Sequence, residues 1–278
     1  MPLIKMKDIL SWAEENNCAV GAFSVGNMEM VIGAVKAAEE MNTPIILQIA
    51  EKRMKHSPLH LMAPMMVSAA KSAKVPVAVH LDHGLTIGCI KTALEYGFTS
   101  VMLDGSLLPF EENIELTKQV CAEADKYGAT VEAELGVVGG NEGDTAVHKI
   151  QCTDPGKALE FCEKTGVDCL AVAIGNAHGN YPVLPELRFD VLEDIYQKVK
   201  TPLVLHGGTG ITDEMFRKAI SLGVRKINIA TASFDALANK TKEYTATADK
   251  PDYFTLSPAM ADAVYENVKN HIKIFLNK

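Results

Sequence analysis

Short apolar runs alternate with longer amphipathic segments along the whole chain. The short runs have the length and composition of buried strands. They predict strands over Ala19–Phe23, Ile45–Ile49, Val77–Leu81, Ser100–Leu103, Thr130–Leu135, Cys169–Ala173, Leu203–Leu205 and Lys226–Ile229. Between them, apolar residues recur every three or four positions, which predicts amphipathic helices. These helices are expected over Glu29–Met41, Leu59–Ala73, Ile87–Tyr96, Phe110–Tyr127, Pro155–Thr165, Asp190–Val199 and Thr212–Leu222, followed by Ser233–Tyr244 and Pro258–Leu276.

Eight units of a strand followed by a helix favour an α/β fold, a (β/α)8 TIM barrel with an additional C-terminal helix. Glycines such as Gly97 and Gly223 stand between a helical run and the next strand, where helices commonly end. A doubly wound open sheet is the alternative, but the first strand–helix turn, GAFSVGNMEM, lacks the GxGxxG pattern of that fold. Because no linker or low-complexity tract interrupts the chain, we expect residues 1–278 to form a single domain.

Composition and charge narrow the class of protein. The chain has 278 residues, 47% of them hydrophobic, and can bury a large core without disulfides. Its 35 acidic residues outnumber 27 basic ones, and the net charge of −8 argues against nucleic acid or an anionic membrane as the main partner. No apolar stretch approaches the ~18 residues of a membrane span, no signal peptide is recognisable, and the six cysteines lack CxxC spacing. We therefore expect a soluble, cytoplasmic protein with free thiols.

Three histidines stand where strands of such a barrel end. His83 follows the third strand, His178 the sixth and His206 the seventh. In a (β/α)8 barrel these ends meet at one face, which carries the chemistry. Three neutral imidazoles with one open position form the ligand set of a catalytic zinc ion. The alternative is that each is an isolated, hydrogen-bonded histidine, and His80, inside a strand pattern, is expected in the core or as a hydrogen-bond donor behind the site.

Acidic residues occupy the same level of the barrel. They are Asp82, Asp104, Glu132 and Glu134, in the segments HLDH, MLDG and VEAELG. A carboxylate at such a place costs desolvation unless it binds a cation or moves a proton. Asp82, next to His83, is the natural proton-transfer group. Asp104 and Glu134 are candidate oxygen ligands for a second metal position, or alternatively orient the histidines.

The segment 136–151, GVVGGNEGDTAVHKIQ, is glycine-rich and longer than a barrel loop requires. Long ordered loops in compact domains are usually functional. Glu142 near its tip is therefore a candidate base that reaches the substrate when the loop closes. The alternative is a surface loop without a role.

Two neighbouring segments are typical of a phosphate site. HGGTGI after the seventh strand opens a helix with Thr212 as its cap, and its glycines leave backbone N–H groups free to bind an anion. INIATASF after the eighth strand places Asn228 and Thr231 beside it. The seventh and eighth loops form the usual phosphate site of this fold.

Taken together, HLDHG, DGS, EAELG, GGNE, GNAHGNY, LHGGTG and KINIAT resemble the class II, zinc-dependent fructose- and tagatose-bisphosphate aldolases, in order over nearly the whole chain. The resemblance implies a lyase of carbohydrate metabolism that makes or cleaves a ketose 1-phosphate, with dihydroxyacetone phosphate and an aldehyde as the two halves. It also implies dimers or tetramers acting on small sugar phosphates.

The resemblance assigns roles to residues of this chain. His83, His178 and His206 would hold zinc, and Asp104 and Glu134 match positions that can take a second metal. Asp82 would exchange a proton with the substrate hydroxyl at the cleaved bond, and Glu142 would act at the dihydroxyacetone-phosphate carbon. The ketose phosphate, often with a monovalent cation nearby, would be bound by Gly179, Gly207, Gly208, Thr209, Asn228 and Thr231. Zinc would serve as a Lewis acid for the enediolate, so that no Schiff-base lysine is required.

Departures from the family pattern gather around the other half of the substrate. Ser24 stands where the family usually has asparagine, and Ala50 where a small hydroxyl residue commonly contacts substrate. The usual glycine-rich continuation reads EKRMKH. The family's Asp-Pro-Arg, whose arginine reaches the distal phosphate across a subunit interface, reads Lys250-Pro251-Asp252, and a carboxylate there repels phosphate.

We therefore expect an acceptor other than glyceraldehyde 3-phosphate, namely a non-phosphorylated or longer polyhydroxy aldehyde. Lys52, Arg53 and Lys55 are candidates to meet a carboxylate on it, or alternatively form a solvated surface. Three other functions stay open: a bisphosphate aldolase proper, a metal-dependent sugar-phosphate isomerase or epimerase on the same fold, and a non-catalytic barrel that partners an enzyme.

Overall fold

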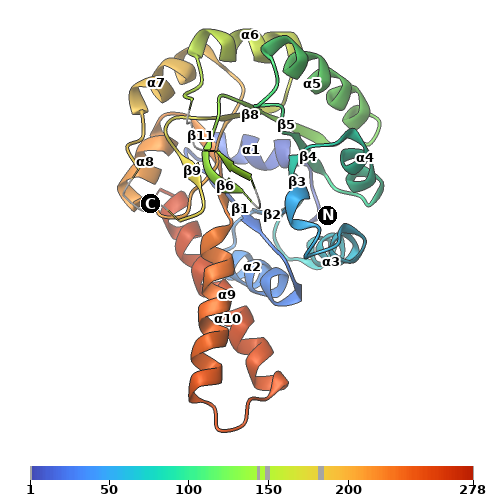
Figure 1. The fold of residues 1–278 in the computed structure, drawn as a ribbon, viewed down its shortest axis with the longest axis vertical. Helices are drawn as coiled ribbons and strands as arrows, with labels where there is room; N and C mark the ends of the chain where they lie inside the picture. Colours follow the sequence, from blue (N-terminus) through green and yellow to red (C-terminus); the bar gives the residue numbers. More distant parts are fainter. Residues whose placement is uncertain (1, 143–144, 148–150, 181–184, 278) are drawn as a thin grey trace.

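Eight parallel strands close into a barrel at the centre of the molecule (Figure 1). The computed structural model describes residues 2–142, 145–147, 151–180 and 185–277. Around the barrel the order is β1, β11, β10, β8, β5, β4, β3 and β2. These strands are β1 (Val20–Ser24), β2 (Ile45–Ala50), β3 (Val77–Gly84), β4 (Ser100–Leu103), β5 (Thr130–Leu135), β8 (Cys169–Val172), β10 (Leu203–Leu205) and β11 (Val224–Ile229). The expected (β/α)8 barrel is confirmed.

Helices cover the outside of the barrel and connect its strands (Figure 1). They are α2 (Met28–Glu40), α3 (Leu59–Ser72), α4 (Ile87–Glu95), α5 (Phe110–Asp125), α6 (Pro155–Thr165), α7 (Phe189–Lys198), α8 (Asp213–Ser221), α9 (Thr231–Thr247) and α10 (Tyr253–Phe275), with a 3-10 turn, η1 (Glu51–Arg53), after β2. The C-terminal helix begins five residues before the expected Pro258, because the Asp252 side chain accepts a hydrogen bond from the Thr255 N–H and caps the helix there. Helices α9 and α10 form a hairpin that extends away from the barrel (Figure 1).

One helix was not expected from the sequence. Helix α1 (Met6–Glu15) precedes β1 and buries Met6, Ile9 and Leu10 against the inner apolar cluster of the barrel, which includes Val20 and Ile46. Its buried positions have the spacing of an amphipathic helix. It covers the barrel at the amino ends of the strands, where the Lys7 N–H donates to Oγ1 of Thr130 at the start of β5.

The glycine-rich segment 136–151, expected as a loop, contains two short strands. β6 (Gly139–Glu142) pairs antiparallel with β7 (Thr145–Val147) and parallel with β9 (Ala177–His178). Glycine-rich sequences carry little strand signal, so this pairing depends on the tertiary contact with β9. The small sheet lies at the carboxyl end of the barrel (Figure 1) and joins this segment to one of the three histidines.

The structure also bears on membrane-spanning helices and on the cysteines. Within the described part of the chain, no helix combines the length and apolar character that a membrane crossing demands. The six cysteines, all within the described residues, form no disulfide; Cys18 and Cys169 are buried and the other four are partly buried.

Candidate active site

The last residues of β3 are irregular where they carry Asp82 and His83. The register with β4 shifts between Leu81 and Gly84, and His83 has a left-handed backbone with a φ of 40°. Bulges redirect side chains, and a non-glycine residue in this conformation costs roughly 1–3 kcal/mol. The strain is located at a residue that the sequence singled out, and both side chains are buried at the end of the strand.

Three imidazoles converge at this end of the barrel. The ring of His83 lies 4.6 Å from that of His206 and 4.9 Å from that of His178, centroid to centroid. One nitrogen from each ring lies within 4.8 Å of the others, a spacing that can hold a metal ion. Burial, followed by the charge of His83, holds the pKa of both His178 and His206 well below the ordinary value. Both rings are therefore neutral near pH 7, the form in which imidazole binds metals.

Carboxylates hold two of these rings from behind. Nδ1 of His83 lies 2.8 Å from Oδ2 of Asp104, and Nε2 of His206 lies 2.8 Å from Oε1 of Glu132. Burial by itself raises the pKa of Asp104, but the hydrogen bond and charge of His83, with two hydrogen bonds from Ser106, hold it well below its usual range. A carboxylate accepts hydrogen bonds, so each ring donates from the nitrogen that faces it and leaves its other nitrogen directed toward the metal position.

The other nitrogens of those two rings face each other. Nε2 of His83 and Nδ1 of His206 are 2.9 Å apart. Two ring nitrogens at this distance share a proton or a cation, and imidazoles with carboxylates behind them are the donor set of zinc sites. The arrangement therefore fits a metal ion.

A second group of candidate ligands shares His83. His83, Asp104 and Glu134 offer atoms that all lie within 4.8 Å of one another. Oε2 of Glu134 is also 3.4 Å from Nδ1 of His206. These residues line a small cavity together with Lys52. Lys52 thus lines the cavity of the candidate second metal position and not the cavity that Asp82 lines.

His178 owes its place to close backbone packing on both sides of β9. A Cβ on Gly140 would lie 2.2 Å from the carbonyl oxygen of His178, and a Cβ on Gly207 would lie 2.1 Å from the carbonyl oxygen of Ala177. Both glycines have left-handed backbones, with φ of 88° and 65°. Only glycine allows this approach, so β9 is held between the two.

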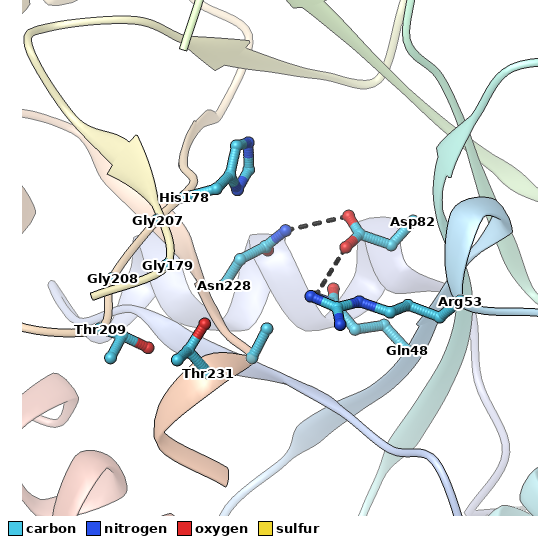
Figure 2. Close-up of a pocket in the computed structure, with 11 residues that line it drawn as sticks. Gln48, Arg53, Asp82, His178, Gly179, Gly207, Gly208, Thr209, Asn228 and Thr231 are labelled. Atoms are coloured by element: carbon cyan, nitrogen blue, oxygen red, sulfur yellow. Dashed lines mark hydrogen bonds between the residues drawn. The ribbon is translucent and has the colours of Figure 1, made fainter. Parts of the chain in front are cut away.

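A cavity opens beside His178 (Figure 2). The six residues expected to bind the ketose phosphate all line it: Gly179, Gly207, Gly208, Thr209, Asn228 and Thr231. Asp82, His178, Gln48, Arg53 and Ala230 complete its walls. The structure therefore brings together residues from five barrel strands and the segments that follow them, as the barrel topology predicts.

The helix that begins at this cavity is α9. Its first residue, Thr231, lines the wall, and the Ala232 N–H bonds to Oγ1 of Thr209. Thr212 does cap α8, as expected, through the Met215 N–H, but it is not among the residues that line the cavity. The positive end of a helix dipole attracts anions. Of these two helix starts, that of α9 therefore borders the cavity and that of α8 does not.

Asp82 lines this cavity and lies between two amide side chains (Figure 2). Its Oδ1 accepts from Nδ2 of Asn228 at 3.0 Å, and its Oδ2 accepts from Nε2 of Gln48 at 3.1 Å. Gln48 also donates to Oγ of Ser24. The sequence interpretation missed Gln48, although a lone amide inside the apolar run IILQIA marks an inward polar position.

The other residues predicted from the sequence are the basic residues after β2 and Glu142. Of the basic residues after β2, only Arg53 lines the cavity with Asp82, and its guanidinium lies 5.3 Å from the ring centre of Phe234. Lys55 is exposed. Glu142 is the last residue of β6, and its side chain is outside the described part of the structure.

Comparisons with known proteins agree over the whole length. The family described as "Fructose-bisphosphate aldolase class-II" matches residues 4–278. A fructose-bisphosphate aldolase of Staphylococcus aureus (strain Mu50 / ATCC 700699) is 41% identical over 281 residues, covering 99% of this chain and 98% of that protein. A probable fructose-bisphosphate aldolase of Bacillus subtilis (strain 168) is 40% identical over 282 residues, with the same coverage. The crystal structure of the YdjI aldolase from Escherichia coli K12 matches with a TM-score of 0.88 and 38% identity, over 98% of this chain and 97% of that one.

Proposed function

The chain belongs to the class II fructose-bisphosphate aldolase family, and from this premise we propose that it is a zinc-dependent aldolase for a ketose 1-phosphate with an altered acceptor half. The observation that carries the zinc assignment is the inward pair of nitrogens on His83 and His206, each backed by a carboxylate. His83, His178 and His206 would hold the ion. When bound, zinc supplies a Lewis acid that stabilises the negative charge developing on the substrate carbonyl.

The chain's own residues account for the proton transfers. Asp82, held by Asn228 and Gln48, would take the proton from the substrate hydroxyl as the carbon–carbon bond breaks and return it in synthesis. Glu142 would move the proton at the dihydroxyacetone-phosphate carbon. The start of α9 and the glycines after β10 would bind the phosphate and so fix the position of the reacting carbons.

Removing the metal tests the proposal directly. Dialysis against a chelator is expected to abolish release of dihydroxyacetone phosphate from ketose 1-phosphates, and added zinc is expected to restore it. The product is measured with a coupled dehydrogenase, and bound metal is measured by elemental analysis. A metal-free protein with full turnover would contradict zinc dependence, while turnover of sugar phosphates without dihydroxyacetone phosphate would point to an isomerase or epimerase.

The proposal about the acceptor rests on the residues that this chain has where the family binds the distal phosphate of the substrate. Asp252, in place of the family's arginine, uses its carboxylate to cap α10. Arg53 instead brings a cation to the wall of the cavity near Asp82. We propose that the acceptor is a non-phosphorylated or longer polyhydroxy aldehyde, and that Arg53 binds a carboxylate on it. Turnover of fructose 1,6-bisphosphate comparable with that of the best long ketose 1-phosphate would refute this part.

The variant Arg53→Met is expected to raise the KM for carboxylate-bearing ketose 1-phosphates by about 10- to 100-fold, because a charge-assisted hydrogen bond contributes about 1.5–3 kcal/mol. The KM for neutral ketose 1-phosphates of the same length should hardly change. Lys55→Met, which removes an exposed cation two residues further along, serves as the matched control. Equal KM changes for charged and neutral substrates would show that Arg53 does not bind the carboxylate.

We also propose that residues 1–278 act as one barrel domain in a cytoplasmic homodimer or homotetramer. Free cysteines and the negative net charge are consistent with this setting. Asp104 and Glu134 would offer a second metal position and a monovalent cation would accompany the phosphate. Sedimentation velocity measures the oligomeric state, and elemental analysis measures the number of metal ions bound per chain.

A further inference from the structure

A continuous chain of hydrogen bonds passes through the barrel from His206 to Asp82. Nε2 of His206 bonds to Oε1 of Glu132 at 2.8 Å, and Oε2 of Glu132 bonds to Nζ of Lys226 at 2.8 Å. The same Nζ bonds to Oδ1 of Asn228 at 2.7 Å, and Nδ2 of Asn228 bonds to Oδ1 of Asp82 at 3.0 Å. One lysine therefore lies midway between a candidate metal ligand and the candidate proton-transfer group.

This lysine has no access to solvent or substrate. His206, Glu132 and Lys226 are all 0% exposed, and Lys226 is not among the residues that line the substrate cavity. The interior of such barrels is ordinarily filled by branched apolar side chains. A buried ion pair is rarely more stable than a well-packed apolar pair of the same volume. Stability alone therefore gives no reason for a lysine and a glutamate at these positions.

The chemistry of an ammonium group determines the orientation of Asn228. A lysine side chain donates hydrogen bonds and accepts none. Asn228 must therefore turn its carbonyl oxygen toward Lys226, and its NH₂ group then faces Asp82. Without the ammonium group, the amide is free to flip and to present its oxygen to the carboxylate. The lysine thus ensures that Asp82 meets a donor.

The ammonium group of Lys226 also affects His206, through Glu132. It neutralises the buried carboxylate, which accepts from Nε2–H of His206. That bond selects the tautomer with the lone pair on Nδ1, the nitrogen that faces His83. We propose that Lys226 is a positioning residue that fixes both the tautomer of His206 and, through Asn228, the orientation of Asp82. The assignment of Asp82 to carbon–carbon bond cleavage rests on the proposed function.

Three variants separate positioning from simple charge balance. Lys226→Met leaves Glu132 buried without a cation, so we expect lower thermal stability and about 10- to 100-fold weaker metal binding, the usual effect of losing a residue behind a ligand. The double variant Lys226→Met/Glu132→Gln removes both charges and retains an oxygen that accepts from His206. We expect it to recover stability and metal affinity. Arg225→Met removes a buried cation of the same strand that bonds to Glu14 instead, and serves as the matched control.

The deciding measurement is the ratio of two rates. One is cleavage of a ketose 1-phosphate, which uses Asp82; the other is exchange of the dihydroxyacetone-phosphate C–H proton with deuterium oxide, which does not. In the double variant we expect cleavage to stay about 10- to 100-fold below the wild-type rate, as for a misplaced catalytic group, while exchange returns to nearly the wild-type rate. Arg225→Met should leave the ratio unchanged.

Each other outcome overturns the inference. Full recovery of cleavage in the double variant would mean that Lys226 only balances the charge of Glu132. A borohydride-trapped adduct of dihydroxyacetone phosphate that is lost in Lys226→Met would make Lys226 a nucleophile. If the wild-type protein releases no dihydroxyacetone phosphate, the proposed function fails, but chelator competition still decides the His206 half, because unchanged metal affinity in Lys226→Met contradicts it.

Discussion

Replacing Asp82 by alanine is expected to lower the rate of carbon–carbon bond cleavage by about 10²- to 10⁴-fold, the usual contribution of a general acid or base. The side chain is 3% exposed and accepts hydrogen bonds from Asn228 and Gln48, so both carboxylate oxygens are fixed in the cavity. Asp82 does not belong to the group of candidate metal ligands formed by the three histidines. Metal content and exchange of the dihydroxyacetone-phosphate proton are therefore expected to stay close to wild-type values.

The measurements are cleavage of a ketose 1-phosphate, deuterium exchange into dihydroxyacetone phosphate, and zinc per protein chain. Asp262→Ala removes an exposed aspartate that is paired with Lys36, and should change none of the three. If cleavage and exchange fall together while zinc is retained, Asp82 does not act specifically at the bond that breaks. If neither falls, the role proposed for it is wrong.

The variant Gly207→Ala is expected to weaken metal binding and to lower kcat/KM by about 10²-fold or more, because a shift of about 1 Å in an active site has effects of this size. The new Cβ would lie 2.1 Å from the carbonyl oxygen of Ala177, the residue before His178. The left-handed backbone of Gly207 adds strain of roughly 1–3 kcal/mol for any other residue. Both effects displace β9 and with it one of the three imidazoles.

Chelator competition and steady-state kinetics measure this effect. Gly88→Ala is the matched control, because a Cβ on this glycine near the start of α4 has no atom within 4 Å. It should leave metal affinity unchanged and stabilise the protein slightly, since alanine favours a helix over glycine by about 1 kcal/mol. If Gly207→Ala binds zinc as tightly as the wild-type protein, the packing of β9 does not position His178.

The hydrophobic pattern was sufficient for the barrel and for most of the site. Alternating strands and helices determine which strand ends share a face, so His83, His178 and His206 could be grouped without any structure. The same rule predicts that Asn228 and Thr231 lie beside the glycines after β10, whereas Gly179 was assigned from the family resemblance alone. Helix α1 was missed even though its apolar spacing is regular, and so the cover over the amino ends of the strands was not foreseen.

Features that depend on contacts between distant segments could not be predicted in this way. The strand pairing of Gly140 with His178 arises from backbone packing, and nothing in a glycine-rich sequence specifies its partner. The charge of Lys226 within the run KINI is visible in the sequence, but Glu132, its partner, lies on a strand across the barrel. Side-chain orientation, such as that of Arg53 and Lys52 toward different cavities, is likewise set by the local 3-10 turn.

If His178 binds the ion and Glu142 moves a proton as proposed, the pairing of β6 with β9 links ion binding to acid–base chemistry. His178 lies on β9, and Glu142 ends the adjacent strand, so both belong to the same three-stranded unit. Whatever stabilises that unit favours the ion, and the ion in turn favours the unit. Thermodynamic reciprocity then requires that a ligand contacting Glu142 raise zinc affinity by the same factor by which zinc raises affinity for that ligand.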